Sequence, residues 1–262
     1  MPVLGAVRLP AQGAVRLPAP VEELPLYAGF SIDPPFFEVG PKAFLYGRAI
    51  VELARAADRI AERYRVGIIL TPQSVDIAAV ARETRFVRVF AQHVDSIPVG
   101  RGIGTVLPEA AREAGAVGVL LNHAEKRLTL SEINRTIRRA DEVGLATLVC
   151  ADTPEEAAAI AHLGPNIILA EPPDLIGTSD AGVAGRNYVA RTNELVRSID
   201  PRIRVLHGAG ISGPQDVSDI VAMGAEATGC TSAVVKAKDP AAALDAMIRA
   251  MREAWDRAHP RG

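Results

Sequence analysis

Short apolar runs alternate with longer amphipathic stretches from about residue 36 to the end of the chain. Each run has five or six residues and most lack polar alternation, which is typical of parallel strands buried on both faces. Between the runs, apolar residues recur every three or four positions, and this spacing predicts helices. The predicted strands are residues 36–40, 66–71, 87–91, 117–121, 145–150, 166–170, 203–207 and, most weakly, 225–229.

Several of the predicted helices carry recognisable end signals. The Thr-Pro pair at 153–154 and the Asp-Pro pair at 239–240 each supply a capping side chain and a proline for the first turn. Gly144 and Gly164 are expected to end their helices. The predicted helices are residues 49–64, 75–83, 107–115, 130–144, 153–164, 187–199, 213–224 and 239–258.

Eight strand–helix units predict a single α/β domain, a (β/α)8 barrel over residues 25–262. Such a barrel usually has about 250 residues. A doubly wound open sheet is the alternative. The first strand also has a rival, because residues 26–33 (LYAGFSID) would place Ser31 where residues 36–40 place Lys42. We prefer 36–40 because its spacing to the next helix is better.

Residues 1–24 are expected to stay outside the barrel. The octapeptide GAVRLPAQ at 5–12 is followed at once by GAVRLPAP at 13–20. A repeat this short and rich in proline cannot bury a core, so an extended or disordered segment is predicted. It also lacks the apolar stretch of a signal peptide.

Composition and charge narrow the class of protein. The chain has 262 residues, is 48% apolar and 4% aromatic, and carries a net charge of −2. It has no long basic run, so neither nucleic acid nor an anionic membrane is an expected partner. No apolar run reaches the ~20 residues of a membrane-spanning helix. Cys150 and Cys230 are the only cysteines, which favours a reducing compartment and predicts a cytoplasmic protein.

Polar side chains that suit proton transfer stand at the ends of the predicted strands. Lys42 follows the first strand, His123 and Glu125 follow the fourth, and Glu171 ends the sixth, directly before two prolines. A carboxylate can take a proton from carbon, an imidazole can polarise the neighbouring oxygen, and an ammonium can balance the developing negative charge. Active sites of these barrels lie at the strand ends, so an acid–base site is predicted there.

Glycine-containing turns after the seventh and eighth strands suggest a phosphate site. The stretches HGAGIS and TSAVVKA contain Gly210, Ser212, Thr231 and Ser232, whose backbone N–H groups are the candidate donors. Such N–H groups and helix starts bind phosphate, and these two loops are a recurrent phosphate site in this barrel.

Each candidate also has a structural interpretation. A lysine after a strand is usually a solvated loop charge, His123 fits a structural histidine, and Glu125 fits an ion-pair partner of Lys126, Arg127 or a neighbouring loop. His93 and Glu125 near His123 raise the possibility of a metal site, but no ligand spacing such as HxxxH is present. No metal is therefore expected.

Six stretches carry a resemblance to a known family: FAQHVDSIPVG, VLPEAAREAGAVGVLLNHAEKR, RRADEVGLATLVCAD, AEPPDLIGT, VLHGAGIS and VVKAKDP. Together they cover about residues 45–255, and the chain resembles triosephosphate isomerases of the compact archaeal type. The resemblance implies an isomerase that needs no cofactor, interconverts dihydroxyacetone phosphate and glyceraldehyde 3-phosphate, and forms a homo-oligomer, a dimer or a tetramer.

The resemblance also assigns roles to residues. Glu171 is similar to the family's catalytic base, His123 to its neutral electrophile, and Lys42 to the lysine that holds the substrate. Glu125 is similar to a buried supporting acid of the family.

The remaining matches concern substrate binding. Residues 172–178, which include Gly177, resemble the family's mobile lid. Ser212, Thr231 and Ser232 fall in its phosphate loops.

The chain departs from the family at two places near the substrate. The family's Asn-x-Lys of the first strand reads Gly40-Pro41-Lys42, and its Thr-Gly of the third loop reads Ile103-Gly104. Loss of both the family's asparagine and its threonine indicates a reshaped pocket with Gly40 at its wall. The alternatives to a triose phosphate isomerase are therefore an isomerase of a four-carbon ketose phosphate, such as erythrulose phosphate, or a catalytically silent barrel that binds phosphometabolites.

Overall fold

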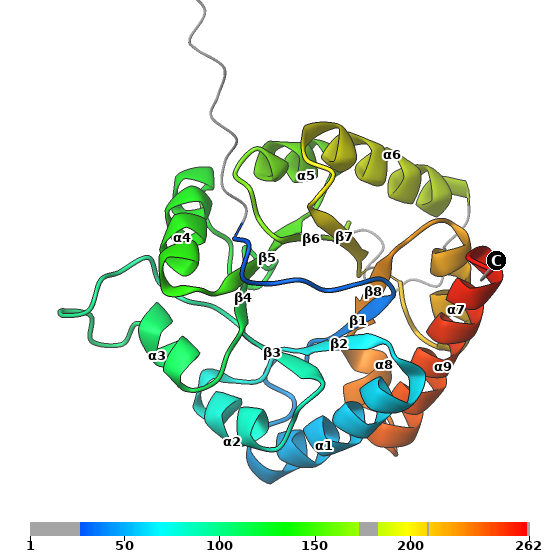
Figure 1. The fold of residues 1–262 in the computed structure, drawn as a ribbon, viewed down its shortest axis with the longest axis horizontal. Helices are drawn as coiled ribbons and strands as arrows, with labels where there is room; N and C mark the ends of the chain where they lie inside the picture. The colour runs from blue at the N-terminus through cyan, green and yellow to red at the C-terminus, as the bar shows by residue number, and fades with distance from the viewer. Residues whose placement is uncertain (1–26, 173–182, 209, 261–262) are drawn as a thin grey trace, which may run out of the picture.

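The chain folds into a closed barrel of eight parallel strands. The computed structural model describes residues 27–172, 183–208 and 210–260. Neighbouring strands pair in sequence order and the last pairs with the first, so the sheet closes on itself (Figure 1). The strands are β1 (Phe36–Val39), β2 (Gly67–Leu70), β3 (Val87–Ala91), β4 (Gly118–Leu121), β5 (Ala146–Ala151), β6 (Ile167–Ala170), β7 (Arg204–His207) and β8 (Ala227–Cys230).

Helices follow the strands and surround the barrel, as Figure 1 shows. They are α1 (Gly47–Tyr64), the 3-10 turn η1 (Ser74–Asp76), α2 (Ile77–Arg82), α3 (Pro108–Glu113), α4 (Leu130–Val143), α5 (Pro154–Ala161), α6 (Val183–Ile199), α7 (Pro214–Ala222), α8 (Ser232–Val235) and α9 (Pro240–Ala258). None of the helices in the described ranges is long and apolar enough to cross a bilayer.

The strand side chains alternate between two cores. Phe36, Ile69 and Phe90 belong to a cluster inside the barrel. Phe37 and Val39 belong to the larger cluster between the strands and the helices. Both faces of every strand are therefore covered, which explains why the strands appear in the sequence as nearly continuous apolar runs.

The predicted barrel is confirmed, including all eight strands, and pairing of β1 with β8 excludes the open sheet. The predicted caps are also present: Thr153 accepts from the N–H of Glu156, and Asp239 accepts from the N–H of Ala242. Gly144 ends α4 with a φ of 77°. Gly164 does not cap α5 directly, because that helix ends at Ala161 and the glycine forms the turn that follows.

The rival first strand at 26–33 is wrong for its described residues, 27–33, which form no strand. This segment instead covers the amino-terminal end of the barrel. Ile32 packs into the interior cluster, Phe30 lies edge-on to Phe90 with ring centroids 5.5 Å apart, and the carbonyl of Tyr27 accepts from the Asn166 side chain. The segment competes poorly for a place in the sheet because 36–39 pairs with strands on both sides.

Candidate active site

A cavity of about 480 Å³ lies at the carboxyl ends of the barrel strands. Its wall brings together most of the residues that the sequence predicted: Gly40, Lys42, His123, Glu125, Glu171, Gly210, Thr231 and Ser232. Ser212 is not among the lining residues, and Gly177 lies outside the described residues. Side chains from loops far apart in the sequence therefore face one space.

Glu171 stands at the first position after β6. Its N–H donates to the carbonyl of Ala151 at 2.9 Å, so the backbone still follows β5 at this point. Burial raises the pKa of the carboxyl group, while the positive charge of Lys42 opposes that rise. A partly desolvated carboxylate is a stronger base than one in water, which suits proton abstraction from carbon.

His123 presents a neutral ring to the cavity. Its Nδ1 accepts from the N–H of Glu125 at 3.0 Å, so the proton of the neutral ring is on Nε2. Burial lowers the pKa of this imidazole, and the charge of Lys42 lowers it further. Nε2–H is therefore a donor for a substrate oxygen.

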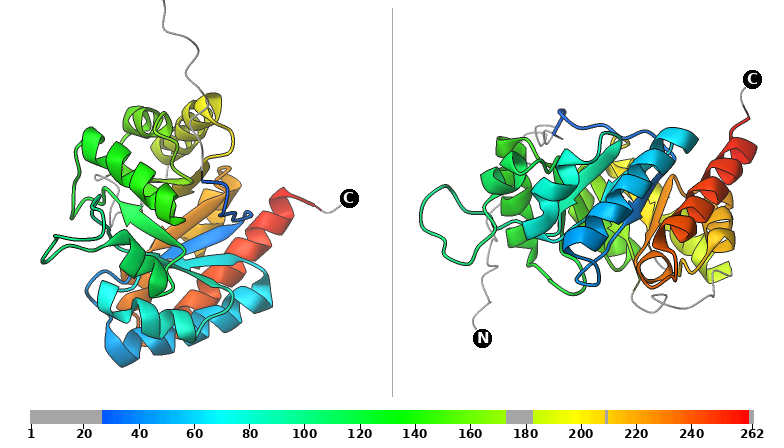
Figure 2. Two further views of the ribbon diagram at one scale, coloured as in Figure 1. Left: turned by 60° about the vertical axis from the view of Figure 1, so that its left-hand side comes forward. Right: turned by 90° about the horizontal axis from the view of Figure 1, so that it is seen from below.

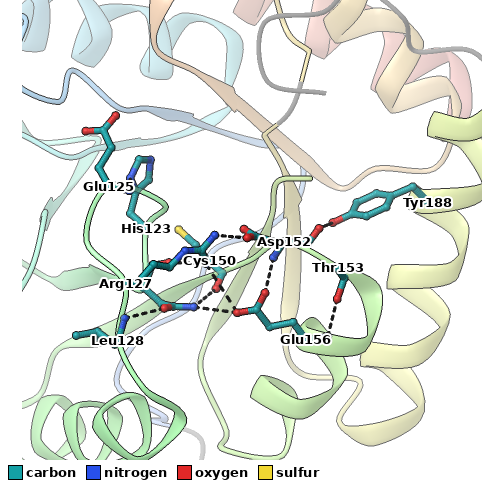
Figure 3. Close-up of polar contacts among 10 residues, drawn as sticks. His123, Glu125, Arg127, Leu128, Cys150, Asp152, Thr153, Glu156 and Tyr188 are labelled. Carbon is teal, nitrogen blue, oxygen red and sulfur yellow. Dashed lines mark hydrogen bonds and ion pairs between the residues drawn. The ribbon is translucent and has the colours of Figure 1, made fainter. Parts of the chain in front are cut away.

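The loop after β4 is held from below by a polar network. Asn122 adopts a left-handed φ of 57°, donates to the carbonyl of Cys150 at 3.0 Å, and accepts from the N–H of Leu128 at 3.0 Å. Arg127 pairs with Asp152 beside it. In Figure 3, His123 and Glu125 stand apart from this network, so the network fixes the base of the loop without engaging these two side chains.

Lys42 lies at the mouth of the cavity in an ion pair with Glu125. Nζ lies 2.7 Å from Oε1, and this contact lowers the pKa of Glu125. The lysine backbone has a φ of 48°, and the side-chain amides of Gln73 and Gln92 both donate to its carbonyl at 2.9 Å. Neither glutamine was expected from the sequence.

The expectation that Glu125 is a buried acid is wrong. Its side chain is 65% exposed, because its carboxylate reaches outward to Lys42 rather than into the protein. The structural interpretation, which paired it with Lys126, Arg127 or a neighbouring loop, is met by the last of these, because its partner Lys42 lies on the loop after β1.

Sequence reasoning missed Glu38, a carboxyl group on the cavity wall within β1. The residue is 6% exposed, and the hydroxyl of Thr71 donates to its Oε1 at 3.1 Å. Burial raises the pKa of Glu38 to about 8. The available signal was an acid inside the apolar run FFEVG, two residues before Gly40 and therefore on the same face of the strand.

In the loop after β7, for which the sequence predicts phosphate binding, Ser212 is already engaged. Its N–H and its hydroxyl donate to one oxygen of Asp216 at 2.8 and 2.5 Å, and the N–H of Gly213 donates to the same oxygen. This carboxylate caps α7. The N–H of Ser212 therefore becomes available to an anion only when Asp216 turns away, whereas Gly210, Thr231 and Ser232 line the cavity directly.

No metal-binding group was found in the part of the chain that the structure describes. There, no three His, Cys, Asp or Glu side chains are placed to hold an ion. His93 instead pairs with Asp95 at 3.1 Å.

Comparison with known proteins identifies the family. The family model described as triosephosphate isomerase matches residues 45–251. The chain belongs to the triosephosphate isomerase family. It is 40% identical over 218 residues to the triosephosphate isomerase of Methanosarcina barkeri, covering 82% of this chain and 98% of that protein. The enzyme of Saccharolobus solfataricus is 34% identical, with 82% of this chain and 95% of that protein covered.

The fold comparison agrees with the barrel. The crystal structure of triosephosphate isomerase from Bartonella henselae matches with a TM-score of 0.68 and 18% identity, covering 82% of this chain and 99% of that one. The expected family and its archaeal branch are thus confirmed, and the chain is an isomerase. The roles assigned to individual residues stay predictions.

Proposed function

We propose that the protein interconverts dihydroxyacetone phosphate and glyceraldehyde 3-phosphate in the cavity at the carboxyl ends of the strands. The observation that carries the proposal is the meeting of Glu171, His123 and Lys42 on one wall. Burial favours a basic carboxylate and a neutral imidazole there. The family, whose relatives are triosephosphate isomerases, supports the same substrate.

In the proposed reaction, the Glu171 carboxylate takes a proton from the carbon beside the carbonyl. The C–H bond breaks, its electron pair forms a C=C bond, and negative charge moves to the carbonyl oxygen, where His123 Nε2–H and the Lys42 ammonium stabilise it. Return of the proton to the neighbouring carbon, with transfer of a hydroxyl proton, gives the aldehyde. Atoms and electrons balance within substrate and side chains, so the reaction requires no cofactor.

Proton exchange with solvent tests this proposal. Deuterium incorporation is measured by NMR for dihydroxyacetone phosphate and L-erythrulose 1-phosphate side by side. Faster exchange into the triose supports the proposal. Faster exchange into the tetrulose favours the second candidate, a four-carbon ketose phosphate isomerase, which the departures from the family at Gly40 and Ile103 suggest. Exchange into neither contradicts both and leaves the silent binding barrel.

The variant Glu171→Gln separates catalysis from binding. Loss of a general base lowers turnover by roughly 10²–10⁴-fold, while binding of glycerol 3-phosphate in calorimetry is retained. Turnover near the wild-type rate would overturn the assignment of Glu171.

We propose that the protein forms a homo-oligomer, a dimer or a tetramer, through loops at the carboxyl edge of the barrel. Large apolar side chains on the segments after β1, β2 and β3 are exposed: Tyr46 by 70%, Val75 by 88%, Val99 by 71% and Ile103 by 107%. The segment between β3 and α3 projects away from the barrel (Figure 2). Such residues mark interaction surfaces. Light scattering should give at least two chains per particle, with Ile103→Glu shifting the mass downward; a monomeric wild type contradicts the proposal.

A cytoplasmic location is the last part of the proposal. Cys150 and Cys230 are both buried and unpaired, in keeping with a reducing compartment. Cell fractionation tests this, and recovery outside the cytoplasm contradicts it.

A further inference from the structure

Glu38 points into the barrel beneath the cavity. Its neighbours on β1, Phe37 and Val39, face the helices, whereas Phe36 lies in the interior cluster. Side chains of a strand alternate between faces, so Glu38 and Gly40 share the inner one. The carboxyl group therefore stands one layer below the position where the strand ends and the site begins.

The missing side chain at position 40 leaves room for this carboxyl group. A Cβ atom on Gly40 would lie 3.1 Å from Glu38 Oε1 and 3.2 Å from Thr231 Oγ1. On the other side, a Cβ on Gly229 would lie 2.7 Å from the Glu38 carbonyl oxygen and 3.1 Å from its Oε2. Two glycines thus frame Glu38, so its side chain occupies space that any larger residue at either position would take.

One oxygen of this carboxyl group is left for a ligand. Within the described residues, Thr71 is its only hydrogen-bond partner, and that bond goes to Oε1. The second oxygen, Oε2, has no such bond, and Glu38 lines the cavity. Oε2 accepts no hydrogen bond from the described residues, so it is available to a ligand hydroxyl group in the cavity.

The surroundings keep the group protonated near neutral pH. Burial is the main cause of its pKa of about 8; Glu171 raises the pKa, whereas the Thr71 bond and Lys42 lower it. Among the described residues, two buried thiols also interact with it electrostatically, Cys150 of β5 and Cys230 of β8. A protonated carboxyl group can donate to an oxygen without repelling an anionic substrate.

We propose that Glu38 is a substrate-contacting residue whose carboxyl group hydrogen-bonds to a hydroxyl group of the phosphorylated sugar. It substitutes for the polar side chain that Gly40 lacks. The identity of the ligand rests on the proposed function, whereas the contact itself rests on the geometry of β1.

The test compares Glu38→Gln, Glu38→Ala and a matched control, Asp141→Asn. Asp141 of α4 is also a carboxyl group with a pKa raised by burial, to about 7, but it does not line the cavity. Thermal melting first establishes that each variant is folded. Then kcat/KM for dihydroxyacetone phosphate is measured from pH 6 to pH 10.

Glu38→Ala is expected to lower kcat/KM at pH 7 by about tenfold, the loss of one hydrogen bond in the site. In the wild type, kcat/KM should fall above pH 8 as Glu38 loses its proton and becomes charged. Glu38→Gln keeps a neutral donor, so it should stay within about fivefold of the wild type at pH 7 and lack that alkaline fall. The control should match the wild type throughout.

Two results would overturn the proposal: Glu38→Ala within twofold of the wild type, or an alkaline fall that persists in Glu38→Gln. If Glu38→Ala does not fold, the pH profile of Glu38→Gln decides alone. If the wild type turns over no triose phosphate, the proposed function fails, and calorimetry with glycerol 3-phosphate then tests the contact. Tenfold weaker binding by the Glu38 variant supports it, and unchanged binding overturns it.

Discussion

Replacing Gly40 by asparagine, the residue that resemblance to the family leads one to expect, should destabilise this protein. The new Cβ would meet Glu38 Oε1 at 3.1 Å and Thr231 Oγ1 at 3.2 Å, closer than the ordinary contact range of 3.4–4 Å. Because strand β1 pairs on both sides, the backbone cannot retreat easily. Overpacking of this kind costs about 1–3 kcal/mol of unfolding free energy. For a domain of this size, that corresponds to a fall in Tm of roughly 2–10 °C.

Urea unfolding at fixed protein concentration measures the cost, because concentration affects any oligomer. Gly213→Asn is the matched control, since a Cβ there meets nothing within 4 Å. The double variant Glu38→Gly with Gly40→Asn removes the contact with Glu38 and leaves the one with Thr231. Its loss should therefore be smaller than the sum of the single losses by about 1 kcal/mol or more. Additive losses, or a Gly40→Asn protein as stable as the wild type, would refute the reasoning.

Three further predictions follow from the site. Lys42→Ala should lower kcat/KM at least ~100-fold through loss of charge stabilisation. The control is Lys238→Ala, because Lys238 is exposed and does not line the cavity, and this variant should keep the wild-type kcat/KM. Equal effects of the two variants in steady-state kinetics would contradict the role of Lys42. Asn122→Ala removes the hydrogen bonds to Cys150 and Leu128 and should cost about 2–4 kcal/mol in urea unfolding; a loss below ~1 kcal/mol would show that the network does not hold the loop. Since burial raises the pKa of Glu171 from 4.5, activity should fall with decreasing pH at a midpoint above 4.5, and a midpoint at or below that value would contradict a buried base.

The barrel and the location of the site follow from patterns that are local in the sequence. Continuous apolar runs such as 166–170 mark strands buried on both faces, and parallel strands end on one side of a barrel. This combination predicts that Lys42, His123 and Glu171 meet at one end of the barrel, and all three line the cavity there.

Other features depend on contacts between segments, and these were missed. Glu38 lies within an apolar run, and its meaning depends on the two glycines, one of them on β8, that leave it room. Glu125 is exposed because Lys42, in a left-handed conformation 83 positions away, pulls it outward. The engagement of Ser212 by Asp216 was closer to predictable, since Asp216 stands three residues after the N-cap Gly213, at the position of a capping-box acid.

The close contact between positions 38 and 40 has a consequence for how such a site changes over generations. A chain with an acid at 38 and asparagine at 40 carries the overlap calculated above, while a chain with small residues at both positions carries none. A step-by-step route from an acid at 38 with glycine at 40 to a small residue at 38 with asparagine at 40 therefore passes through the doubly small intermediate, and the order of replacements is restricted. Transfer of either residue alone into a relative should fail where transfer of the pair succeeds.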